Sequence, residues 1–141
     1  MILIQNVSHV RTSVSIKMSE SSTINKEALY DAICDARTRI GPNMVQTPMV
    51  ESEKLSRKLR CNLYLKMEHK QRTGSFKLRG AHNKLSLMAR ARAEDPALIN
   101  KTIVTASTGN HGLACLDAMS RYKIQGRIVV PETISQVQEA S

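Results

Sequence analysis

Aromatic side chains are scarce in this sequence, and their scarcity narrows the classes of partner that it can bind. Trp is absent, Phe76 is the only Phe, and aromatic residues make up 3% of the chain. Proteins that bind single-stranded nucleic acid generally stack the bases on aromatic side chains. The formal net charge of +9 is therefore a poor argument for nucleic-acid binding. Because the basic residues are spread along the chain, we expect local sites for anions and no nucleic-acid partner.

Long apolar runs are also missing. No stretch approaches the roughly 18 apolar residues that a membrane-spanning helix needs, and the apolar start, residues 1–4, is too short for the core of a signal peptide. We therefore expect no membrane partner. Residues 1–22 are interpreted as a disordered N-terminal tail, and residues 23–141 as part of one α/β catalytic domain. The Ser-rich, Arg-containing tail leaves mitochondrial targeting open as an alternative to the cytoplasm.

The cysteines and histidines form no metal-binding or disulfide pattern. Cys34, Cys61 and Cys115 are an odd number at wide spacings, unlike a disulfide framework or a zinc site. The four histidines form no HxxxH motif, so we predict no metal site. Free thiols fit a reducing intracellular compartment, and each cysteine is expected to be a small buried apolar side chain.

Hydrophobic periodicity predicts the elements. Apolar residues on one face predict a helix over residues 25–40, capped by Thr23 or Asn25 and ended by Gly41-Pro42. Ser52 is expected to cap a short helix. Alternation over residues 62–67 predicts a strand, and β-branched runs predict buried strands at residues 102–106 and 126–130. With helices between them, the order strand, helix, strand, helix, strand predicts an α/β fold with parallel strands and right-handed crossovers.

Lys77 is predicted to lie at a helix N-terminus. It follows Thr73-Gly74-Ser75, which are favourable turn and N-cap residues, and an apolar stripe then repeats at helical spacing: Leu78, Ala81, Leu85 and Met88. The helix dipole disfavours a lysine ammonium there, as do nearby cations: Lys70, Arg72 and Arg79. A neutral lysine is a nucleophile that can form an imine. The alternative is an ordinary lysine on a solvent-facing helix.

A second loop, Ser107–Gly112, is predicted to follow a strand and open a helix. Ligands bind at this edge of open α/β sheets, where free amides of the first helical turn can hold a carboxylate or a phosphate. Gly109 and Gly112 allow a ligand to approach the backbone. The alternative is a capped turn with no ligand. Neither loop contains a Walker A or a GxGxxG motif.

Taken together, the two loops resemble the N-terminal signatures of the threonine dehydratase and serine racemase family. The matching segments are Thr73-Gly74-Ser75-Phe76-Lys77-Leu78-Arg79-Gly80-Ala81 and Ser107-Thr108-Gly109-Asn110-His111-Gly112. Thr47-Pro48, Leu63-Tyr64-Leu65-Lys66-Met67-Glu68 and Val129-Val130-Pro131-Glu132 look like the same family, in the same order. The resemblance implies the parallel-sheet, tryptophan-synthase-β-like fold of fold type II pyridoxal-phosphate enzymes.

The resemblance also implies roles for individual residues. Lys77 would carry pyridoxal 5'-phosphate as an internal Schiff base and act as a base at the α-carbon of the substrate. Asn110 would hydrogen-bond the ring hydroxyl of the cofactor. Ser107, Thr108, Gly109, Asn110 and His111 would cradle the carboxylate of a small amino acid. The implied reaction is loss of water and ammonia from an L-threonine-like or L-serine-like substrate, by an enzyme that is a homo-oligomer.

The chain departs from that family in three respects. The glycine-rich phosphate-binding loop and the residue that contacts the pyridine nitrogen lie beyond its last residue, and family members are more than twice as long. After Glu132 the sequence leaves the family pattern, as a truncated or alternatively spliced product would. Thr108 stands where racemases have Ser and simple dehydratases often have Ala. Serine racemisation, and a non-catalytic product that associates with full-length subunits, therefore remain as alternatives.

Overall fold

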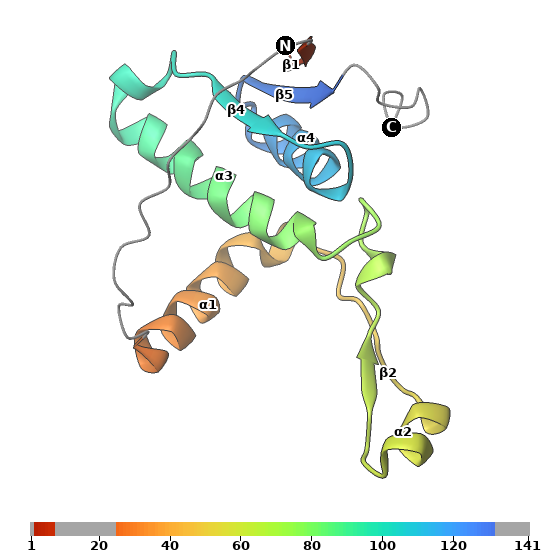
Figure 1. The fold of residues 1–141 in the computed structure, drawn as a ribbon. Helices are drawn as coiled ribbons and strands as arrows, with labels where there is room; N and C mark the ends of the chain where they lie inside the picture. The colour runs from red at the N-terminus through yellow and green to blue at the C-terminus, as the bar shows by residue number, and fades with distance from the viewer. Residues whose placement is uncertain (1, 8–24, 132–141) are drawn as a thin grey trace.

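The computed structural model describes residues 2–7 and 25–131 (Figure 1). Its helices and strands, in chain order, are β1 (Ile2–Val7), α1 (Lys26–Ile40), β2 (Met49–Glu51), α2 (Glu53–Leu59), β3 (Tyr64–Lys66), α3 (Lys77–Glu94), β4 (Ile103–Ala106), α4 (Asn110–Tyr122) and β5 (Gly126–Pro131). Short 3₁₀ turns follow α1, β3 and α3. None of the described helices is long and apolar enough to span a bilayer.

The core lies where α3 packs on α4 and both pack on β5. The stripe predicted for α3 is confirmed: Leu78 is fully buried, Ala81 and Leu85 are buried, and Met88 is half-buried. They meet a matching apolar face that α4 and the following residues provide: Ala114, Cys115, Ala118, Met119, Ile124, Ile128 and Val130. Burial of a large apolar side chain stabilises a fold by roughly 1.5–3 kcal/mol. This small aliphatic cluster therefore fixes the arrangement of the two helices.

The main sheet is three-stranded and parallel, in the order β1-β5-β4. Ile103 pairs with Gly126 and Ala106 with Val129, so β4, α4 and β5 form a β-α-β unit. This unit confirms the mixed α/β class and the parallel pairing predicted for these two strands. Pro131, expected to end the last strand, forms its final residue and pairs with Val7.

The start of the chain differs from the expectation of a disordered tail. Residues 2–7 form β1, which pairs with β5 from Ile2 opposite Gly126 onward. An apolar, partly β-branched run suits a strand, and the second edge of β5 offers it unpaired backbone groups. Residues 8–24 and 132–141 lie outside the described residues, so the rest of the predicted tail stays a prediction.

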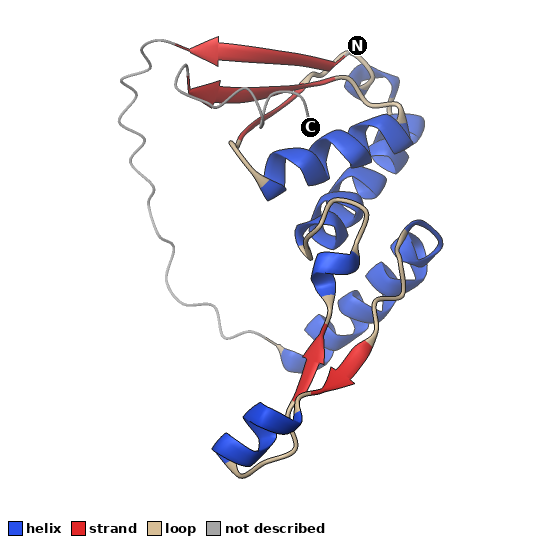
Figure 2. Ribbon diagram, turned by 90° about the vertical axis from the view of Figure 1, so that its right-hand side faces the viewer, coloured by secondary structure: helices blue, strands red, loops and turns tan. Residues whose placement is uncertain are grey.

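The strand predicted at residues 62–67 forms, but it does not join the parallel sheet. It is β3, and it pairs antiparallel with β2 in a separate two-stranded ribbon. Figure 2 shows this ribbon with α2 at its tip, apart from the three-stranded sheet. A short helix between two strands lets the chain turn back on itself, whereas parallel strands need a long crossover. All residues of β2 and β3 are exposed.

Two expected burials are wrong in the described structure. The Asn25 side chain caps α1, as predicted, by accepting from the backbone N–H groups of Glu27 and Ala28. On the predicted apolar face of α1, however, Leu29 is 48% and Ile33 57% exposed. In β4, Val104 is 61% exposed, because this strand pairs only with β5 and is an edge. Several apolar surfaces of the described chain therefore face outward.

Gly126 is predicted to tolerate no side chain. A Cβ at this position would lie 2.5 Å from the side-chain sulfur of Met119 and 3.1 Å from the carbonyl oxygen of Ile103. Gly126→Ala should therefore lower the free energy of unfolding by about 1–3 kcal/mol, as overpacking of a core does. Urea unfolding followed by circular dichroism measures this change.

Gly80→Ala is the matched control. Gly80 lies inside α3, and nothing lies within 4 Å of the place of its Cβ. Alanine is the better helix former by about 1 kcal/mol, so this variant should be neutral or more stable. Equal effects of the two substitutions would show that the contact at Gly126 is not what restricts it.

Candidate functional site

Lys77 is the first residue of α3, as predicted, but the turn before it differs from the predicted cap. Phe76 is the N-cap residue, and no side chain caps the helix. Gly74 has φ of +71°, a left-handed conformation that favours glycine, and its N–H donates to the Gln71 carbonyl at 2.8 Å. Among the described residues, the buried hydroxyls of Thr73 and Ser75 have no hydrogen-bond partner. Unpaired buried hydroxyls are uncommon and occur at functional sites.

A cluster around Glu68 holds the first turn of α3 to the ribbon. Arg79 donates to both carboxylate oxygens of Glu68, at 2.9 Å from Nε and 2.7 Å from Nη2. The Thr47 hydroxyl donates to the same carboxylate at 2.6 Å, and Lys66 Nζ donates to the Thr47 carbonyl at 2.6 Å. Bidentate arginine–carboxylate pairs fix orientation as well as distance. Arg79 comes two residues after Lys77, so this cluster positions the start of the lysine helix.

The Glu68 carboxylate is strongly stabilised. Hydrogen bonds from Arg79 lower the pKa of Glu68 from 4.5 to about 2, against an opposing effect of burial and with a further lowering by the Thr47 hydroxyl. The same hydrogen bonds raise the pKa of Arg79. The sequence predicted that Arg79 and Arg72 add positive charge beside Lys77. The structure instead pairs Arg79 with Glu68 and Arg72 with Asp117.

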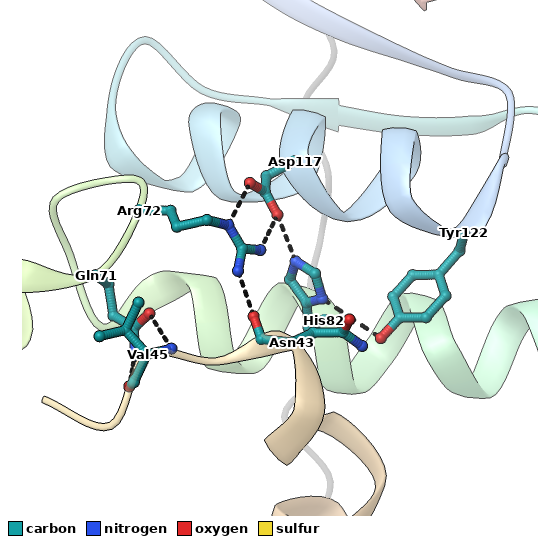
Figure 3. A network of polar contacts seen from close by, with 7 residues as sticks. All are labelled: Asn43, Val45, Gln71, Arg72, His82, Asp117 and Tyr122. Carbon is teal, nitrogen blue, oxygen red and sulfur yellow. Dashed lines mark hydrogen bonds and ion pairs between the residues drawn. The ribbon is translucent and has the colours of Figure 1, made fainter.

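Gln71 ties the other end of the lysine turn to the segment after α1. Its buried side chain accepts from the Val45 N–H at 3.1 Å and donates to the Val45 carbonyl at 2.7 Å (Figure 3). A side-chain amide that uses both groups on one backbone residue mimics strand pairing. The turn is therefore held at both ends. Gln71 holds it before Lys77, and Arg79, through its pair with Glu68, holds it after Lys77.

Ser107 organises the second loop. Its N–H donates to the Val129 carbonyl of β5 at 3.1 Å, and its hydroxyl accepts from the N–H groups of Gly109 at 3.3 Å and Gly112 at 2.9 Å. Within the described part of the chain, the N–H groups of Thr108, Asn110 and His111 donate no hydrogen bond. Free amides at the start of a helix attract an anion. These three residues thus keep the donors that the sequence predicted for a carboxylate, whereas Ser107 donates its N–H to β5 and Gly109 donates its N–H to the Ser107 hydroxyl.

The two glycines of this loop serve different purposes. Nothing lies within 4 Å of the place of a Gly109 Cβ, so the backbone there is open to a ligand, as predicted. At Gly112 the Cβ and the carbonyl oxygen of Ser107 lie 3.4 Å from the same place, which is close to an ordinary van der Waals contact. This side of the Gly112 backbone therefore faces Ser107 and not open space.

The His111 side chain is turned toward β4 and the next turn of its own helix. Its Nε2 lies 3.0 Å from the Thr105 hydroxyl and 3.6 Å from Cys115 Sγ. Burial raises the pKa of the Cys115 thiol. The prediction that each cysteine is buried is confirmed for Cys115 and wrong for Cys34 and Cys61, which are exposed. No group of three His, Cys, Asp or Glu side chains in the described ranges is placed to hold a metal ion.

Lys77 and His111 line one cavity of about 870 Å³ between α3, β4 and α4. Its walls are mostly apolar, and its lining residues include no carboxylate, but several cations: Lys77, Arg79, Lys84, Arg92 and Lys101. Small-molecule sites are typically apolar pockets of about 300–1,000 Å³ with a few polar groups. Thr108, Gly109 and Asn110 are exposed next to His111 and are not among the lining residues. The structure thus brings the two predicted loops to one cavity through Lys77 and His111.

Comparison with known proteins identifies the family. A model described as pyridoxal-phosphate dependent enzyme matches residues 40–140. The chain belongs to that family. It is 40% identical over 93 residues to the chloroplastic biosynthetic threonine dehydratase 2 of Solanum lycopersicum, and 35% identical over 110 residues to the catabolic L-threonine dehydratase TdcB of Escherichia coli. These matches cover 66% and 78% of this chain, but 15% and 32% of the two relatives.

Solved structures of the family have the same fold. The serine racemase of Dictyostelium discoideum superposes with a TM-score of 0.68 at 33% identity, over 78% of this chain and 34% of the racemase. The processed threonine deaminase isoform 2 of Solanum lycopersicum gives 0.68 at 30% identity, over 96% and 38%. The α/β, fold type II assignment is therefore confirmed. The chain spans about a third or less of the length of the curated relatives described here.

The family uses pyridoxal 5'-phosphate, and the residues present fit part of that cofactor. Lys77, at the head of α3, lines the cavity, and lysine is the residue type that binds an aldehyde covalently. The free amides at the start of α4 suit an anionic group. Lys77 would hold the cofactor by its amine, and Asn110, at the first position of α4, would meet a polar group of its ring.

The sequence reasoning missed Glu68, Gln71 and Asp117 as supports of the site. Glu68 was noted only as part of a resembling segment. Asp117 had a visible signal, because it is the single carboxylate in a mostly apolar helix. Its partner Arg72 lies 45 residues away in sequence, and no local pattern identifies such a pair.

Glu68→Gln should destabilise the chain in a pH-dependent manner. Because the folded-state pKa of Glu68 is lowered to about 2, its contribution is fully present above the unfolded-state value of 4.5 and is lost progressively as the pH falls toward 2. At pH 7 the variant should lose about 1–3 kcal/mol of unfolding free energy. The difference from the wild type should shrink below pH 4.5, in urea unfolding at a series of pH values.

Glu53→Gln is the control for this measurement, since Glu53 forms an exposed pair with Arg57 at 3.6 Å in α2. Exposed pairs contribute little, so its effect should be small at every pH. A Glu68→Gln difference that stays constant down to about pH 3.5 would show that the ionised carboxylate does not stabilise the cluster.

Proposed function

We propose that this chain supplies the lysine half of a pyridoxal-phosphate-dependent ammonia-lyase for L-threonine-like or L-serine-like β-hydroxy amino acids. The observation that carries the proposal is the shared cavity of Lys77 and His111, with free amides at the start of α4. Relatives named threonine dehydratase, at 35–40% identity, support the substrate class. The chain spans a third or less of those relatives, so its own activity is part of the proposal.

In this reaction the residues of the chain bind, orient and move a proton. Lys77 Nζ would hold the cofactor by its amine and would accept the proton removed from the α-carbon of the substrate. The amides of Thr108, Asn110 and His111 bind the substrate carboxylate and fix which face of the α-carbon meets Lys77. Bound pyridoxal phosphate supplies an electron sink that stabilises negative charge at that carbon. Loss of the β-hydroxyl as water, then hydrolysis, gives a 2-oxo acid and ammonia.

Thr108 is proposed as an acid or base on the opposite face of the substrate. Its exposed side chain lies between Ser107, which is fixed to β5, and the open backbone of Gly109. A hydroxyl at this position would also allow racemisation, and the serine racemase neighbours keep that activity as an alternative. We further propose a homo-oligomer in the cytoplasm, although one relative is chloroplastic.

A second candidate function is association with full-length subunits without catalysis. The exposed apolar residues of α1 and the open edge of β4 favour it. So do the apolar residues of α3 that line the cavity, among them Leu85, Met88 and Ala91. Such surfaces are typical of segments that pack against another part of a protein.

Reductive trapping tests the first candidate. The purified chain is incubated with pyridoxal phosphate and reduced with borohydride, and the modified lysines are mapped by mass spectrometry. We expect one dominant adduct on Lys77, which disappears in Lys77→Ala and persists in Lys84→Ala. Lys84 is the matched control because it lines the same cavity two helical turns along α3.

Labelling scattered over many lysines would contradict the cofactor role of Lys77. The chain would then be mixed with a full-length threonine dehydratase, and co-elution with loss of its ammonia release from threonine would support the second candidate. A dominant Lys77 adduct together with ammonia release from threonine or serine would support the first.

A further inference from the structure

Asp117 forms polar contacts with residues on both sides of Lys77 in the sequence. Arg72, five residues before Lys77, donates to both of its carboxylate oxygens, at 2.7 Å from Nη2 and 3.3 Å from Nε. His82, five residues after Lys77, lies 2.7 Å from the same carboxylate through Nε2. Figure 3 shows the carboxylate of α4 between the arginine of the turn and the histidine of α3. One side chain of α4 is thus bound to the lysine turn and to the lysine helix.

The histidine in this network is fully buried and uses both ring nitrogens. His82 is 0% exposed, and its Nδ1 lies 3.4 Å from the Tyr122 hydroxyl at the end of α4. A carboxylate only accepts hydrogen bonds, so the proton must be on Nε2. In the neutral ring Nδ1 then accepts from the tyrosine hydroxyl. The same ring also meets Tyr122 edge to face, with centroids 5.4 Å apart.

Arg72 extends the network to a fourth segment. Its Nη1 donates to the Asn43 carbonyl, in the turn that follows α1. Burial acts to raise the pKa of Asp117, but the hydrogen bonds from Arg72 and His82 outweigh it and leave that pKa lowered. The carboxylate therefore stays ionised and keeps both donors in place. The turn after α1, the lysine turn, α3 and α4 meet at this single group.

We propose that Asp117 is a positioning residue that sets Lys77 against the free amides at the start of α4. This inference rests on the proposed function. Asp117 lies seven residues after Asn110 in the same rigid helix, so a fixed distance from Asp117 to Arg72 and His82 becomes a fixed distance from the amides to Lys77. The contacts of Asp117 with Arg72 and His82 are not what packs α3 on α4, because the apolar cluster between these helices does so. Removing Asp117 alone leaves Arg72 and the buried His82 without their carboxylate and should lower stability, so the test needs a readout taken on fully folded protein.

The test compares Asp117→Leu with the wild-type chain. Both are reacted with pyridoxal phosphate and borohydride at a temperature where circular dichroism shows each fully folded, and adducts are quantified by mass spectrometry. We expect the ratio of Lys77 to Lys84 label to fall about tenfold in Asp117→Leu, since small misplacements of a reacting group cost large factors. Glu94→Gln is the control, because it breaks an exposed pair with Arg90 at the far end of α3 and should leave the ratio unchanged.

Three further variants, Arg72→Lys, Arg72→Gln and Asp117→Asn, separate positioning from charge and from folding. Arg72→Lys keeps the positive charge but not the planar fork, so it should lower the labelling ratio as Arg72→Gln does. A wild-type ratio in Arg72→Lys would overturn the proposal. Asp117→Asn, nearly identical in size, should give an intermediate ratio and decides the question if Asp117→Leu fails to fold.

The outcomes distinguish this proposal from the proposed function. If the wild-type chain gives no dominant Lys77 adduct, both are overturned. If the wild type labels Lys77 and folded Asp117→Leu or Asp117→Asn labels it equally well, the positioning role alone is overturned. A labelling ratio that equals the wild type while Asp117→Leu is fully folded, and falls only at temperatures where circular dichroism shows it unfolding, would reduce Asp117 to a structural role and overturn it too.

Discussion

The packing of α3 on α4 is the contact on which the rest of the structure depends. With Ile40 set aside, every buried apolar side chain of the described residues belongs to these helices or to the chain from Ile124 to β5. Lys77 begins one helix and Asn110 begins the other. The apolar contact therefore does more than stabilise the fold, because it brings the two N-termini to one cavity. A substitution that changed how these helices cross would move both halves of the candidate site at once.

Two carboxylates pair with the arginines near Lys77. Glu68 and Asp117 each hold one of the arginines nearest in sequence to Lys77. Both pairs direct an arginine into a bond between segments, and the lining of the cavity has no carboxylate. An anionic ligand that enters it meets Lys77 and other cations without competition from an acidic side chain. The net charge of +9 is thus a property of the surface as a whole, while the region of Lys77 is partly neutralised.

The sequence predicted those features that one element determines by itself. The stripe from Leu78 to Met88 and the β-branched strands give α3, β4 and β5, and Asn25 caps α1. The failures are long-range. The alternation along β3 predicts a strand but does not identify β2 as its partner. The apolar face of α1 predicts a helix but does not reveal that this face is exposed in the described structure. The sequence identifies Lys77, His111 and Asn110 as candidate site residues because they lie beside recognisable turns. The sequence does not identify the pair of Asp117 and Arg72, because these residues lie 45 positions apart and meet only when α3 packs on α4.

The polar contacts around the lysine turn and the exposed apolar faces lie in different parts of the chain. The lysine turn has its supports within the described residues: Val45, Thr47, Glu68, Arg79 and Asp117. The outer edge of β4 and the apolar face of α1 have none. Within the described residues, the geometry around Lys77 is therefore set by these polar contacts and does not depend on the exposed apolar surfaces.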